Sequence, residues 1–314
     1  MVAFTEEIQS TPQSGAHSSL NALLSDHPAR EIPRLVEALG LAPYYLHHED
    51  GIYMFQAKDI SHLPKLPADY AFKGGAAREA LKALLFPGHK SYPARDLDVI
   101  RFGDKPSELD QKIAAQLMDE DSLHGHGVEL VKSFRSYFSS RDLTVNQILL
   151  DNGVIVCTEG ALFDLAAGIV RPAKNEIRKN GWIKGKIFMK VLRLAAEEEA
   201  LGHEVQIEDL PASPDVHPFH IALHLERALQ RGEDVALKYL QKAEEFGIIS
   251  SRCKSRDDLA AFVKELSGKI GEGLEFFKSL PYAIKQKIAD DLETPSGSRD
   301  WRDIYDRHVF NDAE

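Results

Sequence analysis

The strongest constraint on the fold of this chain is a change of pattern at Pro172. Between residues 70 and 170, short apolar runs typical of strands alternate with runs of helical spacing. After Pro172 the apolar residues recur almost only at helical spacing, over 183–200, 217–249 and 256–292, with Pro281 interrupting the last run. The sequence therefore predicts an α+β fold, with a small mixed sheet covered by helices on one face and followed by an all-helical body.

The boundaries of these regions follow from composition and spacing. We expect a polar lead-in at residues 1–30, a head at 31–172, and a helical neck and body at 173–314. A hairpin is expected over 44–57. The other elements expected in the head are strands 70–72, 97–102, 128–133 and 154–157, and helices 76–85, 108–118 and 144–149.

Charge and cysteine content exclude several classes of protein. The formal net charge is −11, which argues against a surface that binds nucleic acid everywhere, although a local basic patch is compatible with it. The two cysteines are too few for a disulfide framework or a four-cysteine zinc site. The first residues lack a signal-peptide pattern, and no apolar stretch is long enough for a membrane span, so we expect a cytoplasmic protein without a membrane partner.

The segment with the clearest chemistry is Phe72-Lys73-Gly74-Gly75, followed by Arg95-Asp96-Leu97-Asp98. Two glycines between a strand and a helix let backbone N–H groups approach an anion, and the helix dipole favours that anion. Asp96 and Asp98 are two residues apart on a strand, so both carboxylates point to one face and suit hard cations. Each half alone is compatible with an ordinary turn or a solvated pair, but together they indicate metal-dependent phosphoryl or nucleotidyl transfer.

These segments, in this order, resemble the head domain of DNA-polymerase-beta-type nucleotidyltransferases, and within it the bacterial tRNA CCA-adding enzymes and poly(A) polymerases. Ser140-Arg141-Asp142-Leu143-Thr144-Val145-Asn146 is similar to the family's Arg-Arg-Asp-Phe-Thr-Ile-Asn block. The run 164–171 resembles its Asp-Leu…Ile-Ile-Arg stretch, and 191–196 its Leu-Arg-x-x-Arg-Phe-Ala-Ala helix. The resemblance spans residues 72–196 and implies a polymerase-beta-like head.

The resemblance also implies roles for individual residues. Asp96 and Asp98 would hold the metal, Mg²⁺ or alternatively Mn²⁺, and Glu129 would be a third catalytic carboxylate unless it faces solvent. A basic run that includes Lys184, Lys190 and Arg193 is either a solvated helix face or a patch for triphosphate or RNA phosphates. The other residues expected to hold the nucleoside triphosphate are Gly74, Gly75, Arg78, Asp142 and Asn146.

The family's base-reading Glu-Asp-x-x-Arg template has no counterpart here. The corresponding positions are Ile183-Lys184-Gly185-Lys186-Ile187, which lack the acidic pair and the arginine. Ordered addition of C, C and A is therefore not expected. His217, His220 and His224 share a helix face, but no acidic or cysteine partner stands at ligand spacing, so a structural role is favoured over zinc.

The expected activity is transfer of a nucleoside monophosphate from a nucleoside triphosphate to a hydroxyl acceptor, with release of pyrophosphate. An RNA 3′ end is the favoured acceptor. The alternatives are a hydroxyl of a small molecule or protein, or a catalytically silent nucleotide- or RNA-binding module of the same fold.

Overall fold

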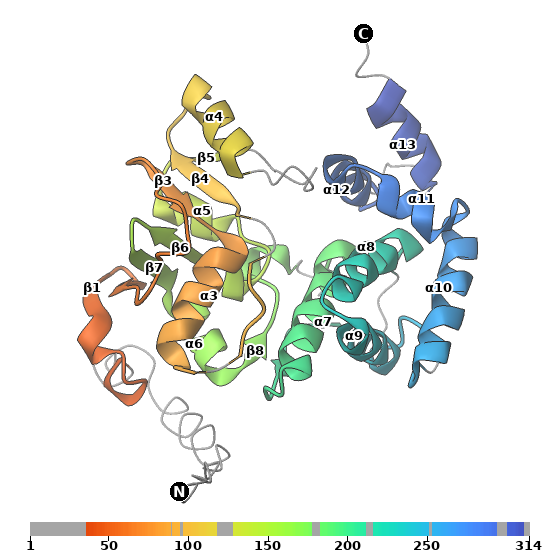
Figure 1. Cartoon of the computed structure of the whole chain (residues 1–314), viewed down its shortest axis with the longest axis horizontal. Helices are drawn as coiled ribbons and strands as arrows, with labels where there is room; N and C mark the ends of the chain where they lie inside the picture. The colour runs from red at the N-terminus through yellow and green to blue at the C-terminus, as the bar shows by residue number, and fades with distance from the viewer. Residues whose placement is uncertain are drawn as a thin grey trace, which may run out of the picture.

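The computed structural model describes residues 36–88, 90–94, 97–117, 128–177, 183–211, 216–250, 253–293 and 300–310. The predicted lead-in at 1–30 and Asp96 lie outside these residues. A head built around a sheet lies beside a body made of helices (Figure 1). The predicted α+β architecture of a mixed-sheet head and a helical body is confirmed.

The head contains a seven-stranded sheet in the order β1-β2-β7-β6-β3-β4-β5. Every neighbouring pair is antiparallel except β4 and β5, so the sheet is mixed. The strands are β1 (Tyr45–Glu49), β2 (Ile52–Gln56), β3 (Tyr70–Phe72), β4 (Val99–Phe102), β5 (Val128–Val131), β6 (Ile148–Asp151) and β7 (Val154–Thr158). The hairpin expected over 44–57 is β1 and β2.

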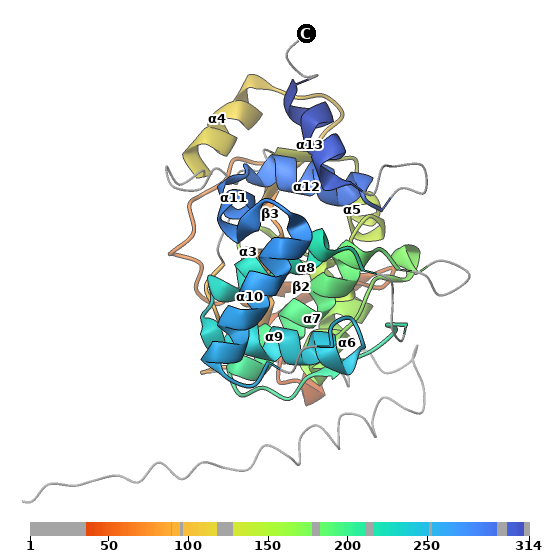
Figure 2. The same cartoon turned by 90° about the vertical axis from the view of Figure 1, so that its right-hand side faces the viewer.

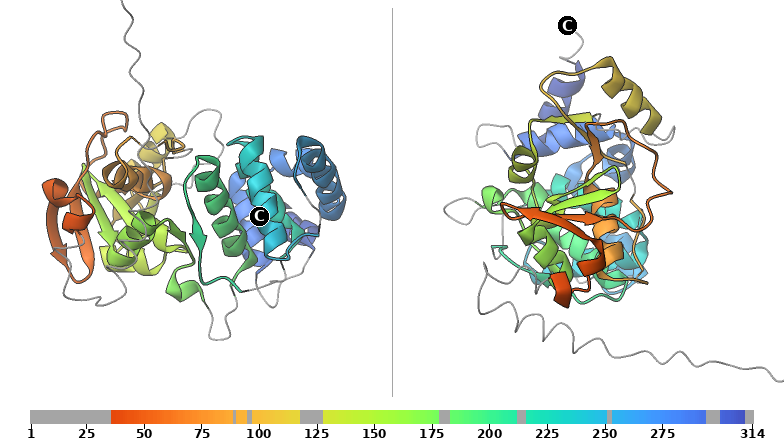
Figure 3. Two further views of the ribbon diagram at one scale, coloured as in Figure 1. Left: turned by 90° about the horizontal axis from the view of Figure 1, so that it is seen from below. Right: turned by 90° about the vertical axis from the view of Figure 1, so that its left-hand side faces the viewer.

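Helices cover both faces of this sheet (Figure 3). The long helices α3 (Gly74–Leu85) and α6 (Glu159–Ala167) pack on one face, whose core also includes Ile113 of α4 (Glu108–Leu117). The short α5 (Phe134–Ser139) packs on the other face with Tyr137 and Phe138, against Ala71, Ile100, Val131, Leu149 and Val156. The sequence pattern indicated only the first of these two layers.

The helix expected over 144–149 is wrong. Only Thr144–Asn146 forms a 3-10 turn (η2), and Ile148–Asp151 is strand β6 between β3 and β7. Because both faces of the sheet are covered at this strand, Ile148, Leu149 and Leu150 are all buried. A central strand of this kind has no apolar–polar alternation, and a short apolar run cannot be told from a buried helix by spacing.

The remaining short elements lie at the two ends of the head. The 3-10 turn η1 (Ala42–Tyr44) precedes β1, and β8 (Ile169–Val170) and the 3-10 turn η3 (Lys174–Glu176) lie between α6 and α7. The strands β8 and β9 (Gln206–Ile207) form a separate parallel pair.

The body consists of seven helices in the described part of the chain, and Figure 2 looks onto them with α10 in front. They are α7 (Gly185–Ala200), α8 (Pro218–Leu229), α9 (Glu233–Glu245), α10 (Arg256–Ile270), α11 (Gly273–Ser279), α12 (Tyr282–Asp291) and α13 (Trp301–Phe310). The long helical runs seen in the sequence are divided at Gly232, Gly271 and Pro281. Gly232 and Gly271 have positive φ, which a continuing helix does not allow.

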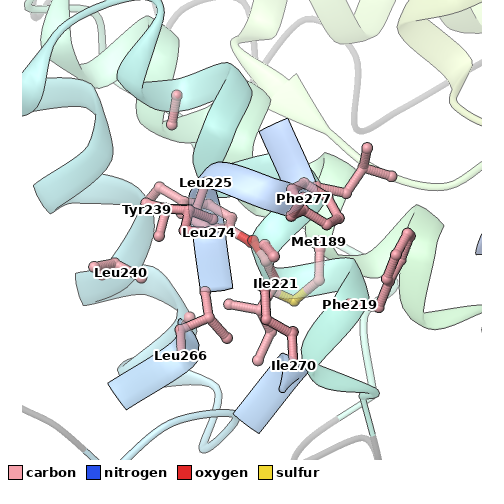
Figure 4. Packing of buried hydrophobic residues seen from close by; sticks show 14 of the residues in the cluster. Met189, Phe219, Ile221, Leu225, Tyr239, Leu240, Leu266, Ile270, Leu274 and Phe277 are labelled. Carbon is pink, nitrogen blue, oxygen red and sulfur yellow. The ribbon is translucent and has the colours of Figure 1, made fainter. Parts of the chain in front are cut away.

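Apolar side chains from all seven helices, α7 to α13, form the core of the body. Figure 4 shows Met189 of α7, Phe219 of α8 and Tyr239 of α9 meeting residues of α10 and α11. All three side chains are fully buried. The helices therefore share one continuous hydrophobic core.

Helix α7 belongs to both cores. Its side toward the head carries Ile187, Val191 and Leu194, and its side toward the body carries Phe188, Met189, Leu192 and Ala196. The polar residues Lys186, Lys190, Arg193 and Glu197 lie at helical spacing on a third side. This polar side faces the space between head and body.

Candidate functional site

A cleft of about 710 Å³ lies between the head and the body. Elements from both contribute to it, including α3, β5, η2 and residues 92–94 of the head, and α7, α8 and α12 of the body. Nine residues that the sequence singled out line this cleft: Gly74, Gly75, Arg78, Asp98, Glu129, Asp142, Asn146, Lys190 and Arg193. Lys184 is not among the lining residues, and Asp96 lies outside the described residues. A second cavity of about 380 Å³ adjoins the cleft and shares Arg78 and Glu198 with it.

The glycine turn and Asp98 are held against each other. The N–H group of Lys73 donates to the carbonyl oxygen of Asp98 at 2.9 Å, which continues the antiparallel pairing of β3 with β4. Gly74 has a φ of +62°, and a Cβ placed on it would lie 3.2 Å from Oδ2 of Asp98. A Cβ on Gly75 would lie 3.3 Å from Cβ of Ala94. Both glycines therefore allow a close approach that a side chain would obstruct.

The start of α3 is left without a side-chain cap. Its N-cap residue Lys73 makes no capping hydrogen bond, and the first turn contains no acidic residue. The first N–H groups of a helix lack partners within the helix, and they attract an anion. Because Gly74 and Gly75 line the cleft, these groups lie beside it.

Glu129 on β5 is bound by two cations. The guanidinium of Arg141 donates to its Oε1 at 2.5 Å and to its Oε2 at 3.2 Å, and the ammonium of Lys73 donates to Oε2. Burial raises the pKa of Glu129, but these contacts outweigh it and leave the pKa below its usual range. The side chain thus lines the cleft as an anchor for Arg141 and Lys73, and a catalytic role for Glu129 stays a prediction.

A chain of hydrogen bonds crosses the cleft from α3 to α7. Arg78 donates to Oδ1 of Asn146 at 2.9 Å, and Nδ2 of Asn146 donates to Oδ1 of Asp142 at 2.8 Å. Lys190 donates to Oδ2 of Asp142 at 2.5 Å. Burial raises the pKa of Asp142, but the ammonium of Lys190 and the bond from Asn146 hold the pKa well below its usual range. The network fixes four predicted site residues, Arg78, Asn146, Asp142 and Lys190, in one arrangement.

Two of the sequence blocks are joined in the interior of the head. Asp164 is fully buried and accepts hydrogen bonds from the hydroxyl of Thr144 and, at 2.7 Å, from the guanidinium of Arg171. Arg171 also pairs with Glu208 at 3.0 Å. Arg171, the last residue of the block 164–171, therefore supports the segment that carries Asp142 and Asn146.

The remaining cations of the cleft come from the body. Arg193 of α7 is buried and paired with Glu197. Arg227 lies over the ring of Tyr282 at 4.4 Å. Arg231 lies over the ring of Tyr92 at 5.0 Å and donates to the carbonyl oxygen of Pro93 at 2.8 Å. The sequence pattern indicated Arg193 but not Arg227 or Arg231. The only sequence feature that could have pointed to these two arginines is their four-residue spacing, which places them on one face of a helix.

The segment 183–187 does not present a base-reading surface of its own. Ile183 and Ile187 are 2% and 5% exposed and pack in the core of the head. Lys184 precedes α7, and its carbonyl oxygen accepts from the N–H groups of Ile187 and Phe188. Within the segment only Lys186 lines the cleft.

The histidines of α8 support the start of α7. His220 pairs with Glu293 at 2.6 Å, and the carboxylate of Glu293 accepts from the N–H group of Lys186 at 3.0 Å. Nε2 of His224 bonds the carbonyl oxygen of Lys186 at 3.0 Å, and burial lowers the pKa of His224, so the ring is neutral. His217 accepts from the N–H group of Phe219. Among the described residues, no group of three or more histidine, cysteine, aspartate or glutamate side chains is placed to hold a metal ion.

The donor set around Asp98 fits a hard divalent cation in part. The carboxylate of Asp98 is half-buried, faces the glycine turn and makes no ion pair with another described residue. Carboxylate oxygens are the ligands that Mg²⁺ prefers, usually together with water and substrate phosphates. Asp98 therefore supplies one suitable ligand.

Comparison with known proteins gives loose structural likenesses. The sequence matches no protein-family model and no curated protein. Solved structures with a similar arrangement include a Thermotoga maritima CCA-adding enzyme complexed with tRNA, with 13% identity, a TM-score of 0.35, and coverage of 92% of this chain and 68% of that one. A CCA-adding enzyme with CTP has 16% identity, a TM-score of 0.32, and coverage of 92% and 69%. One with ATP has 13% identity, a TM-score of 0.34, and coverage of 92% and 68%. Such TM-scores mark a loose likeness, so the function proposed below rests on the residues of the cleft.

The helices were also compared with the requirements of a membrane span. Among the residues described, none of the helices combines the length and the apolar character needed to cross a bilayer.

Proposed function

We propose that this chain is a metal-dependent nucleotidyltransferase, which transfers a nucleoside monophosphate from a nucleoside triphosphate to a hydroxyl acceptor and releases pyrophosphate. The observation that carries the proposal is the approach of the Asp98 carboxylate to the glycine turn at the start of α3. An anion-binding turn and a metal-binding carboxylate thus open into one cleft, which cationic side chains surround.

Each part of the cleft has a task in this proposal. The N–H groups at Gly74 and Gly75 bind phosphate oxygens, and Arg78, oriented by Asn146, neutralises their charge. Lys190 is fixed by Asp142 and adds a second positive charge on the body side. Binding the triphosphate between two units orients it toward an acceptor, and orientation is a large part of catalysis in phosphoryl transfer.

Asp98, together with Asp96, would hold Mg²⁺ or Mn²⁺. When bound there, the cation would lower the pKa of an attacking hydroxyl and stabilise the charge that develops on pyrophosphate. Arg141 and Lys73, anchored by Glu129, would keep the adjoining wall of the cleft positive.

The acceptor that we propose is an RNA 3′ end. The four sequence blocks resemble those of enzymes that extend RNA, and the cations Arg227 and Arg231 lie on the body side of the cleft. The net charge of −11 favours a second candidate, a hydroxyl on a small molecule or a protein, because an acidic surface repels RNA outside the cleft.

The experiment that tests the function supplies each labelled nucleoside triphosphate with Mg²⁺ and total cellular RNA, and identifies the labelled product. We expect labelled RNA with the native chain and none with Asp98→Asn. Asp257→Asn, which changes an exposed aspartate of α10, is the matched control and should remain active. Labelled protein or small molecule instead of RNA would select the second candidate. Absence of any label from every fraction would refute the transferase.

A second measurement concerns the product. A tRNA that lacks its last three nucleotides is supplied with CTP and ATP, and its 3′ ends are sequenced. We expect no faithful CCA ends, because Ile183 and Ile187 lie in the core of the head and cannot contact a base. Faithful ends would show that another part of the chain performs the ordered selection.

A further inference from the structure

The cavity of about 380 Å³ beside the cleft has no task in the proposed function. It lies between α3, β8, α7 and the residues 202–205 that follow α7. Four of its lining residues also line the cleft: Arg78, Glu79, Leu194 and Glu198. A cavity of this volume holds about a dozen heavy atoms, at roughly 30 Å³ each. It is therefore large enough for a small organic molecule.

The buried part of the lining, which we call the floor, is mainly apolar. Its one charged member, Asp164, is already bound by Thr144 and Arg171. A floor of this kind favours a ligand with an aliphatic or cyclic body, because contact with it removes apolar surface from water. The apolar residues of the floor are Val145, Leu165, Ile169, Val170 and Leu194.

On the wall toward the cleft, two carboxylates share one lysine. Lys82 donates to Glu198 and, at 3.3 Å, to Oε1 of Glu79. Burial raises the pKa of Glu198, but Lys82 and a hydrogen bond with His203 outweigh it, so the pKa is lowered and Glu198 is charged. The second oxygen of Glu79, Oε2, is buried and has no hydrogen-bond partner among the described residues. The wall therefore carries more negative charge than Lys82 balances.

The other charged residues of the cavity do not supply the missing cation. Lys90 and Glu204 are both exposed, and their charges are opposite. Arg78 donates to Oδ1 of Asn146, which lines the cleft and not the cavity. An ammonium group in the cavity would provide both a positive charge and N–H donors. A rotation of the Glu79 carboxylate, which the last side-chain torsion readily allows, would turn Oε2 toward such a donor.

We infer that this cavity binds an organic amine, with the ammonium group at Glu79 and Glu198 and the apolar body on the floor. The amine site stands on the cavity alone, but its effect on the cleft rests on the proposed function. Because Glu79 and Glu198 also line the cleft, an ammonium group that neutralises them leaves Arg78 more attractive to phosphate oxygens. Amine and triphosphate therefore strengthen each other's binding, as coupling between two sites is reciprocal.

The test measures binding to the full chain by ligand-observed NMR titration at neutral pH. The probes are hexylamine, 1-hexanol and hexanoate, which share a six-carbon chain and differ in the charge of the head group. Hexylamine should bind in roughly the millimolar range, as expected for seven heavy atoms, and about tenfold more tightly than 1-hexanol or hexanoate. Saturating ATP with Mg²⁺ should tighten hexylamine binding about fivefold.

Two variants locate the bound amine. Ala83→Phe places a ring in the cavity from an exposed position of α3 and should abolish the binding of hexylamine. Glu79→Gln keeps the size of the side chain and should weaken hexylamine about tenfold while leaving 1-hexanol unchanged. The matched controls are Ala261→Phe, at an exposed position of α10, and Glu199→Gln, whose carboxylate pairs with Lys242 outside both spaces. Both controls should bind hexylamine like the native chain.

The outcomes separate the amine site from the proposed function. Binding of 1-hexanol or hexanoate to the native chain as tight as that of hexylamine, or no binding of hexylamine, overturns the amine site. Hexylamine binding that survives Ala83→Phe or Glu79→Gln undiminished also overturns it. If ATP binds but leaves the affinity for hexylamine unchanged, the coupling is overturned and the amine site stands. A chain that does not bind ATP overturns the proposed function and the coupling, while the variants still decide the amine site.

Discussion

Substituting Gly74 by alanine tests the link between the glycine turn and Asp98 directly. Gly74 has a φ of +62°, in the left-handed region that favours glycine. The new Cβ would also lie 3.2 Å from Oδ2 of Asp98, closer than most side-chain contacts. The substitution therefore has two separate effects, backbone strain and displacement of the Asp98 carboxylate.

The size of each effect follows from this geometry. The left-handed conformation costs an alanine about 1–2 kcal/mol, which lowers the free energy of unfolding by that amount. To relieve the contact, the carboxylate must move by a fraction of an ångström. A misplacement of about 1 Å in a catalytic arrangement can reduce the rate roughly 100-fold, so we expect a loss of about tenfold or more in nucleotide transfer.

Gly40→Ala is the matched control. Gly40 has a φ of +66°, almost the same as Gly74, but nothing lies within 4 Å of its added Cβ. Urea unfolding should show a similar loss of stability for both variants, whereas only Gly74→Ala should lose transfer activity. If Gly74→Ala transfers nucleotides as fast as Gly40→Ala, the Asp98 carboxylate does not act at this turn.

Two further predictions concern the carboxylates of the cleft. Glu129→Gln should lower the free energy of unfolding by about 1–2 kcal/mol, because Arg141 and Lys73 lose a charged acceptor. The substitution should not alter the Mg²⁺ concentration needed for activity. A higher Mg²⁺ requirement would instead make Glu129 a metal ligand. The pKa values of Glu129, Asp142 and Glu293 are all held below their usual range, so their contribution to stability is complete at neutral pH and is lost on acidification. The buried, neutral ring of His224 adds a loss that begins below about pH 6.5, where this histidine is protonated only in the unfolded chain. The urea midpoint should accordingly fall gradually from pH 7 to 5 and more steeply below about pH 4.5, and a midpoint that rises on acidification would contradict these pKa directions.

The fold was predictable where local spacing decides the structure. The division into a sheet-containing head and a helical body follows from the change of apolar pattern. Helices of the body begin or end at residues with clear backbone reasons, such as the N-caps Gly232 and Pro281 and the C-cap Gly271. The error at 144–149 arose because β6 is buried on both sides, so its apolar run carries no alternation. The second layer formed by α5 depends on packing across the sheet, which spacing along the chain does not record.

The candidate site was predictable in its head half, and in its body half only at Lys190 and Arg193 of α7. Gly74, Gly75 and Asp98 are close in sequence, and elementary geometry places them together once a strand, a turn and a helix are recognised. Gln286 and Asp290 reach the same cleft only because α12 packs beside the start of α7. That contact is set by tertiary packing, as is the capture of Glu129 by Arg141 and Lys73.

The position of α7 has a consequence for how the chain folds and unfolds. Ile187, Val191 and Leu194 complete the core of the head, although they follow Pro172, where the sequence pattern changes. A fragment that stops at Pro172 would expose the apolar surface these residues cover, and a fragment that starts after it would carry them unpartnered. Head and body are therefore thermodynamically coupled, because unfolding of α7 would remove apolar side chains from both cores at once.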